Sequence, residues 1–382
     1  MKKLTARFHK LFGKSDNLRG FFCPGRVNLI GEHIDYLGGL VLPAAISLGI
    51  TAVIRKNDSR EINIFSSDFD ELTTLNLDSL PRKKQSHWSD FILGVVLHLQ
   101  TNGISISGCD IHISSTLPKA SGLSSSAALE VLCFYMFSKI ESGLEPNRIQ
   151  MALDCQKIEN EFIGVKCGIM DQYAVANGKK SAAILLNCNS LENEIVPLKL
   201  NDYSILLVNS NKSRELATSA YNLRIKECSE SLDIIRSHRD ISNLVDALDE
   251  DLNLIDSPIL RKRTRHAFTE NEHVKEAVKS LKLSDLNSFG KLMHASHLSL
   301  QNDFEVSCPE LNHIVEALTT EPTCLGARMT GAGFGGCCVA LVETESMDEV
   351  SQKLASTYTE TFGFAPSFYQ CIPSDGVHEI AL

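Results

Sequence analysis

Three serines follow a glycine where one sequence pattern gives way to another. The stretch 121–126 (Ser-Gly-Leu-Ser-Ser-Ser) lies between an alternating, strand-like run at 110–114 and a run at 129–140 with apolar residues at helical spacing. The serines therefore open a helix, whose free N–H groups and positive dipole end attract anions. Their hydroxyls can bind phosphate oxygens or a phosphate-bound Mg²⁺. The stretch would suit a nucleoside triphosphate.

A simpler function for the same serines is helix capping, because serine is a preferred capping residue. The usual P-loop pattern G-x-x-x-x-G-K-[ST] occurs nowhere in the chain. Phosphate binding here would therefore require another kind of loop.

A second polar stretch, 24–39, places ionisable side chains between glycines. Arg26 lies in a strand-like run, and Glu32, His33 and Asp35 follow Gly31, which would turn the chain. Carboxylates and an imidazole at such a turn suit the hydroxyl groups of a small polar ligand. A polar loop and a metal site are the alternatives, although Glu-His-x-Asp lacks the H-E-x-x-H spacing of two imidazoles on one helix face.

Two acidic residues flank a break between two predicted helices. The pattern 149–162 is helical, Gly164 and Gly168 interrupt it, and a second helix begins near Asp171. An acid at a helix start is commonly a cap or a dipole partner. Phosphoryl transfer also needs a carboxylate near the accepting hydroxyl, and often another for Mg²⁺. Asp171 and Glu159 are the candidates.

Length and composition bound the class of protein. The chain has 382 residues and 43% hydrophobic content, which favours a soluble protein of two domains at about 100–200 residues each. A net charge of −10 argues against broad nucleic-acid binding. Twelve cysteines without a C-x-x-C pair indicate a reducing cytoplasm. No apolar run reaches the roughly 18 residues that a membrane span needs.

The glycine-rich stretch 331–336 matches G-x-G-x-x-G, but the apolar run that follows, 337–342, is typical of a strand and not of a helix. This context excludes a dinucleotide site and favours a hairpin whose backbone packs closely on another backbone, such as the serine stretch. Strands are also expected at 182–187 and 203–208. We place a domain boundary near here, giving residues 1–200 and 201–382, with a ligand cleft between the domains.

Five motifs, in order along the chain, resemble those of the galactokinase family in the GHMP small-molecule kinase superfamily. They are 25–33 with Asp35 and Tyr36, 122–128, 167–172, 211–216 with Ser219 and Tyr221, and 329–336. The resemblance implies an α+β, two-domain GHMP kinase fold, in which the N-terminal domain is like ribosomal S5 domain 2 and the C-terminal domain is ferredoxin-like.

The resemblance also implies a reaction, ATP and D-galactose giving ADP and α-D-galactose 1-phosphate, the first phosphorylation of galactose catabolism. Asp171 would be the catalytic base and Arg26 its partner. Mg²⁺ would be the cofactor, and a cytoplasmic monomer without nucleic-acid or membrane partners is expected. The residues carried over are, for the sugar, Glu32, His33, Ile34, Asp35, Gly168, Asp171 and Tyr221; for ATP, Ala120, Ser121, Gly122, Leu123, Ser124, Ser125 and Ser126, with Ser66 and Trp88 at the nucleotide end; and for Mg²⁺, Ser126 and Glu159.

Three positions depart from the common family pattern: Ala120 replaces Gly, Ile34 replaces Thr and Leu37 replaces Asn. The last two flank the sugar-binding acids and bear on sugar preference. A kinase for a related sugar, such as an N-acetylated galactose, is one alternative. A catalytically silent sugar sensor is another, but it would not need the whole catalytic set.

Overall fold

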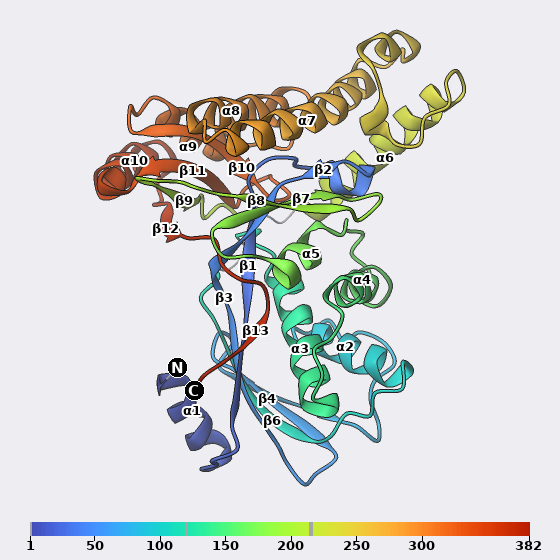
Figure 1. Cartoon of the computed structure of the whole chain (residues 1–382), viewed down its shortest axis with the longest axis vertical. Coiled ribbons are helices and arrows are strands. Elements are labelled where there is room, and N and C mark those ends of the chain that lie inside the picture. Colours follow the sequence, from blue (N-terminus) through green and yellow to red (C-terminus); the bar gives the residue numbers. More distant parts are fainter. Residues whose placement is uncertain (1, 119–120, 214–216) are drawn as a thin grey trace.

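The computed structural model describes residues 2–118, 121–213 and 217–382. Its largest sheet fills the lower half of Figure 1. The strands of this sheet are β1 (Arg19–Asn28), β3 (Pro43–Lys56), β4 (Glu61–Ser66), β5 (Glu71–Asn76), β6 (Cys109–Ser115) and β13 (His378–Ile380). They are ordered β13-β1-β3-β6-β4-β5, and neighbours are antiparallel apart from the parallel pair of β4 and β6.

Helices cover both faces of this sheet. The helices concerned are α1 (Lys2–Phe12), α2 (Asp90–Thr101), α3 (Ser125–Ser142), α4 (Arg148–Ile158) and α5 (Met170–Asn177). Helices α3 and α5 pack on β1 and β3, while α2 and α4 pack on α3. Helix α1 packs on β6 from the opposite side of the sheet (Figure 1). Because α3 is enclosed by the sheet and by other helices, most of its residues from Ala127 to Ser138 are buried.

Two smaller sheets form the upper half of the molecule. One consists of β9 (Tyr203–Asn209), β10 (Cys324–Thr330), β11 (Cys337–Glu343) and β12 (Ser367–Cys371), and the other of β2 (Leu40–Val41), β7 (Ala182–Asn187) and β8 (Asn193–Pro197). Their orders are β10-β11-β9-β12 and β2-β7-β8, and every pair is antiparallel.

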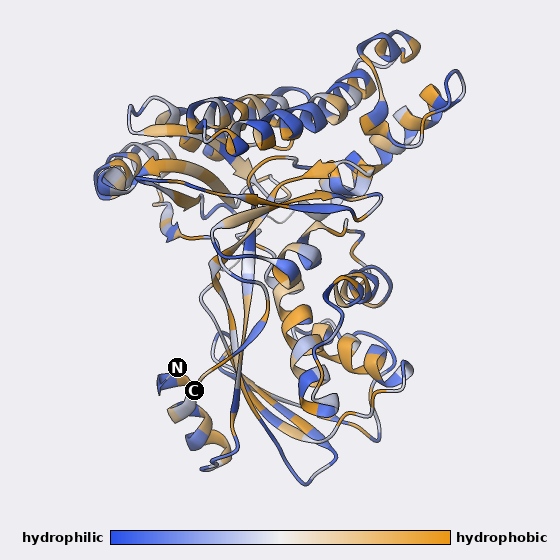
Figure 2. Cartoon of the chain, viewed as in Figure 1, coloured by the Kyte–Doolittle hydropathy of each residue, from blue (hydrophilic) through white to orange (hydrophobic). Residues whose placement is uncertain are grey.

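The α-helices that the structure describes in this upper half are α6 (Ala217–Arg236), α7 (Pro258–Lys282), α8 (Leu286–Asn302), α9 (Pro309–Thr319) and α10 (Met347–Phe362). Helices α8 and α9 pack on β10, while the long helix α7 packs on α8, on α6 and on the sheet of β2 and β8. Figure 2 shows hydrophobic residues along the strands and along α2 and α3, where these elements meet. None of the described helices is both long and apolar enough to span a membrane.

The sequence predictions for the elements around the polar motifs are confirmed. The alternating run is β6, the serines open α3, and the break after the fourth helix precedes α5. The expected strands at 182–187, 203–208 and 337–342 are β7, β9 and β11. No sequence pattern predicted that the last strand, β13, would pair with β1 in the largest sheet.

Candidate active site

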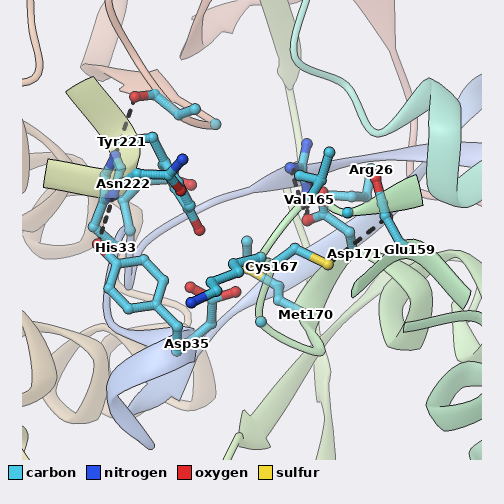
Figure 3. Close-up of a pocket in the computed structure, with 17 residues that line it drawn as sticks. Arg26, His33, Asp35, Glu159, Val165, Cys167, Met170, Asp171, Tyr221 and Asn222 are labelled. Atoms are coloured by element: carbon cyan, nitrogen blue, oxygen red, sulfur yellow. Dashed lines mark hydrogen bonds and ion pairs between the residues drawn. The ribbon is translucent and has the colours of Figure 1, made fainter. Parts of the chain in front are cut away.

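A cavity of about 380 Å³ gathers most of the predicted sugar-binding residues. Its walls come from β1 and the turn that follows it, from the segment between α4 and α5, from α6 and from the turn after β10. Figure 3 shows His33 and Tyr221 on one side of the cavity and Arg26, Glu159 and Asp171 on the other, with Asp35 and Cys167 between them. The lining residues are Arg26, Glu32, His33, Asp35, Tyr36, Glu159, Gly164, Val165, Lys166, Cys167, Gly168, Met170, Asp171, Tyr221, Asn222, Gly331 and Ala332.

The guanidinium of Arg26 holds the carboxylate of Asp171 through two hydrogen bonds. Nε donates to Oδ1 at 2.8 Å and Nη2 donates to Oδ2 at 3.0 Å, the paired geometry that makes Arg–carboxylate contacts strong. The third arm of Arg26, Nη1, donates to the carbonyl of Gly122 at 2.7 Å. Arg26 is 4% exposed and Asp171 is 31% exposed. The guanidinium of Arg26 is therefore buried and fixed, whereas the carboxylate of Asp171 is exposed to the cavity.

His33 lies in a strained turn and is neutral. Its φ of +62° is in the left-handed region, and Gly31 has a φ of +98°. The ring Nε2 donates to the carbonyl of Ala332 at 3.1 Å, so Nδ1 accepts from the hydroxyl of Tyr36 at 3.0 Å. Burial lowers the pKa of His33 to about 3. The imidazole of His33 is thus a fixed, neutral polar group in the cavity wall and does not act as an acid.

The carboxyl of Asp35 occupies the space that a side chain at position 168 would otherwise fill. A Cβ on Gly168 would overlap the Oδ2 of Asp35, so any larger residue there would displace this carboxyl. Burial, and then the nearby charge of Asp171, raise the pKa of Asp35 to about 7. A ligand that offers hydroxyl donors would favour the ionised form of Asp35.

Glu159 begins a π-helical turn (Glu159–Ile163) at the end of α4, a local irregularity that is frequent at functional sites. Its Oε1 accepts from the hydroxyl of Ser126 at 3.0 Å, and its Oε2 accepts from the amide of Gln172 at 2.5 Å. Burial, and then the charge of Asp171, raise the pKa of Glu159 to about 7. A cation beside Ser126 and Glu159 would stabilise the ionised carboxylate of Glu159.

The two oxygen donors fit Mg²⁺. This ion is usually held by one or two carboxylates together with substrate phosphates, and seldom by a cage of protein ligands alone. The described residues contain no cluster of three or more His, Cys, Asp or Glu side chains suited to a metal.

A second cavity has a volume of about 350 Å³, and the hydrogen bond from Ser126 to Glu159 connects its lining to that of the first cavity. It is lined by Ser66, Trp88, Ser125 and Ser126 among the predicted nucleotide residues. The indole of Trp88 stacks on Phe69, with ring centroids 5.5 Å apart and planes 11° apart. Serine hydroxyls at one end and stacked aromatic rings at the other match the phosphate and base ends of a nucleotide.

Several predicted residues do not reach either cavity with their side chains. Ile34 is fully buried in the core beside Gly39, and Leu123 is 1% exposed, because both are apolar and pack inward. Ser121 and Ser124 are also buried, and the carbonyls of Gly122 and Leu123 accept hydrogen bonds from Arg26. Ala120 lies outside the described residues.

Other lining residues were not among those predicted. Tyr36 and Ala332 fix the imidazole of His33, and Asn222 follows Tyr221 on α6. The glycine-rich stretch 331–336 was the sequence feature that could have indicated a role for Ala332. The structure places Gly331 beside the backbone of Gly122, so the predicted close packing of the two loops is confirmed.

Family comparisons agree with this architecture. Residues 90–179 match the N-terminal domain of GHMP kinases, and residues 276–360 match their C-terminal domain. A crystal structure of Methanococcus jannaschii mevalonate kinase, 21% identical, superposes with a TM-score of 0.71 over 93% of this chain and 98% of that one. The fold and the two adjoining cavities define a GHMP-type small-molecule kinase, and the predicted α+β GHMP kinase fold is confirmed.

More specific matches narrow the class. Residues 6–56 match the galactokinase galactose-binding signature. A galactokinase of Clostridium perfringens (strain SM101) is 43% identical over 388 residues, covering 100% of both chains. The crystal structure of Lactococcus lactis galactokinase complexed with galactose is 38% identical and superposes with a TM-score of 0.95 over 99% of both chains. The chain belongs to the galactokinase family.

Proposed function

We propose that the protein transfers the γ-phosphoryl group of ATP to O1 of α-D-galactose, giving α-D-galactose 1-phosphate and ADP. The observation that carries this assignment is the Arg26–Asp171 pair in the wall of the sugar-sized cavity. A hydrogen bond from Ser126 to Glu159 connects that wall to the lining of the nucleotide-sized cavity. Membership of the galactokinase family and the match of residues 6–56 to a galactose-binding signature support galactose as the acceptor.

In this mechanism Asp171 accepts a hydrogen bond from the anomeric hydroxyl. A carboxylate is a far weaker base than an alkoxide, so Asp171 orients the nucleophile more than it removes its proton early. This orienting role suits phosphoryl transfer, in which positioning and charge stabilisation supply most of the rate. Arg26 fixes Asp171 and adds positive charge beside the transferring group.

The remaining roles follow from the walls of the two cavities. Glu32, His33, Asp35 and Tyr221 would bind sugar hydroxyls, and Gly168 leaves the room that Asp35 needs. Ser125 and Ser126 would contact phosphates, with Ser66 and Trp88 at the base end. Ser126 and Glu159 would hold Mg²⁺, which neutralises phosphate charge when bound. All twelve cysteines are free thiols, which is consistent with a reducing cytoplasm.

The test is ADP release with Mg-ATP and galactose, N-acetylgalactosamine, glucose or no sugar. Galactose-dependent turnover with phosphate on O1 is expected. Replacing Asp171 by Asn should lower kcat roughly 100-fold or more while changing galactose affinity only several-fold. Asp348→Asn, at an exposed position on α10, is the control and should match the wild type.

Each alternative gives a different result in the same assay. Turnover with N-acetylgalactosamine alone would assign the protein to a related sugar. Galactose binding without turnover would indicate a sensor. Near-normal kcat in Asp171→Asn would refute the catalytic role of this carboxylate.

A further inference from the structure

The turn that carries the sugar-binding acids is held by a carboxylate from a distant helix. The backbone N–H groups of Gly31 and Glu32 both donate to Oε1 of Glu270, at 2.8 and 3.0 Å. Successive N–H groups beside positive-φ residues form a concavity that binds anions. Here the anion is a side chain of the protein itself, from the middle of α7.

Residues around Glu270 keep this carboxylate in place. Ser296 of α8 donates its hydroxyl to the same Oε1 at 2.6 Å, and the guanidinium of Arg328 lies 3.9 Å away. Both Glu270 and Arg328 are fully buried. Burial alone would raise the pKa of Glu270, but His273, Arg328, His266 and Ser296 together hold it well below its usual range. The group is therefore an anion at neutral pH.

The backbone carbonyl and the side-chain carboxylate of Glu32 are also held by polar contacts. His266, one helical turn before Glu270 on α7, donates from Nε2 to the carbonyl of Glu32 at 3.1 Å. The side chain of Glu32 pairs with Nη1 of Arg328 at 3.0 Å. The backbone on both sides of Glu32 and its carboxylate are thus fixed by residues at least 234 positions away in the chain.

A strained turn persists only where its surroundings over-determine it. Neither Glu270 nor His266 lines the cavity, whereas Glu32, His33 and Asp35 do. We propose that Glu270 is a positioning residue for sugar recognition: its carboxylate holds the Gly31–His33 turn in the conformation that presents these three side chains to the sugar. An apolar residue of similar size would leave two buried N–H groups unpaired and free the turn to relax.

The test measures galactose binding by calorimetry without nucleotide, and ADP binding in parallel. Glu270→Ala should weaken galactose binding about tenfold or more and change ADP affinity less than about twofold. Glu270→Gln should recover part of the loss, because its amide oxygen can still accept from both N–H groups. Glu272→Gln, at an exposed position on the same helix, should behave as the wild type.

Wild-type galactose affinity in Glu270→Ala, or an equal loss of galactose and ADP affinity, would overturn the inference. If Glu270→Ala does not fold, Ser296→Ala keeps the charge and removes one of its supports. That variant should weaken galactose binding about threefold with kcat unchanged at saturating sugar, and unchanged galactose affinity would count against the proposal. The inference rests on the proposed galactose binding: a wild-type protein that does not bind galactose refutes that function, whereas normal binding in the variants refutes only the role of Glu270.

Discussion

Asp35 illustrates the cost of building the proposed sugar site from carboxyls that are largely removed from water. It is enclosed by the turn that carries it and by Gly168, and it lies near the charge of Asp171. Burial first, and Asp171 second, raise its pKa to about 7. Without sugar, the carboxyl is therefore partly protonated near neutral pH. In the proposed complex, the hydroxyl donors of the sugar would replace the lost water, so stability without ligand would be sacrificed for recognition.

The sign of the resulting pH dependence follows from this shift. Between about pH 4 and pH 7 folded Asp35 keeps a proton that the unfolded chain has lost, so stability falls as pH rises, by about 1.4 kcal/mol per pH unit from this group. We expect Asp35→Asn to reduce that slope, as measured by urea unfolding of the ligand-free protein at pH 5, 6, 7 and 8. Asp348→Asn should keep the wild-type slope. Parallel curves for the wild type and Asp35→Asn would show that Asp35 is ionised throughout.

Two glycine-containing turns bring the halves of the molecule together at the proposed reaction centre. The turn after β10 places Gly331, with a φ of +82°, where a Cβ would lie 2.9 Å from the carbonyl oxygen of Gly122. The same carbonyl accepts from Nη1 of Arg26. A shift of either turn would therefore reach Arg26 and, through it, Asp171.

Gly331→Ala tests this contact. Backbone strain alone should cost about 1–2 kcal/mol, and displacement of Gly122 should in addition weaken ADP binding and lower kcat, each about tenfold. Gly363→Ala is the matched control, because Gly363 has a φ of +80° but a Cβ there meets nothing within 4 Å. It should show the loss of stability in urea without the loss of activity. Equal kinetic effects in both variants would contradict the role of the contact.

Local patterns in the sequence predicted the elements and the polar residues that lie close to one another along it. The alternation of β6, the serines that open α3 and the glycine break before Asp171 are all short-range signals. Sequence periodicity could not distinguish Ile34 from its polar neighbours, since a turn has no fixed period. Nor could it find Glu270 and Arg328, because a buried charge is recognised by its partners, and the partners of these two in the 28–32 segment lie more than 230 residues away.

For the whole molecule, the main consequence is that the end of the chain completes the sheet in which it began. Strand β13 pairs with the first residues of β1, with Gly20 opposite Ile380 and Phe22 opposite His378. Val377, just before it, is fully buried and its N–H donates to the carbonyl of Val175 in α5. The first residues of strand β1, Gly20 to Phe22, are thereby enclosed between β3 and β13 and do not form an edge.

Removing residues 377–382 should therefore destabilise the protein and expose β1. The lost ladder bonds and the burial of Val377 together suggest a loss of about 2–4 kcal/mol, and the new edge should promote association of copies. Urea unfolding and size-exclusion chromatography measure the two effects. Glu379→Gln weakens the exposed pair with Arg19 but keeps the strand, so it should cost no more than about 1 kcal/mol. If the truncation and Glu379→Gln were equally mild, β13 would contribute a surface ion pair and little else.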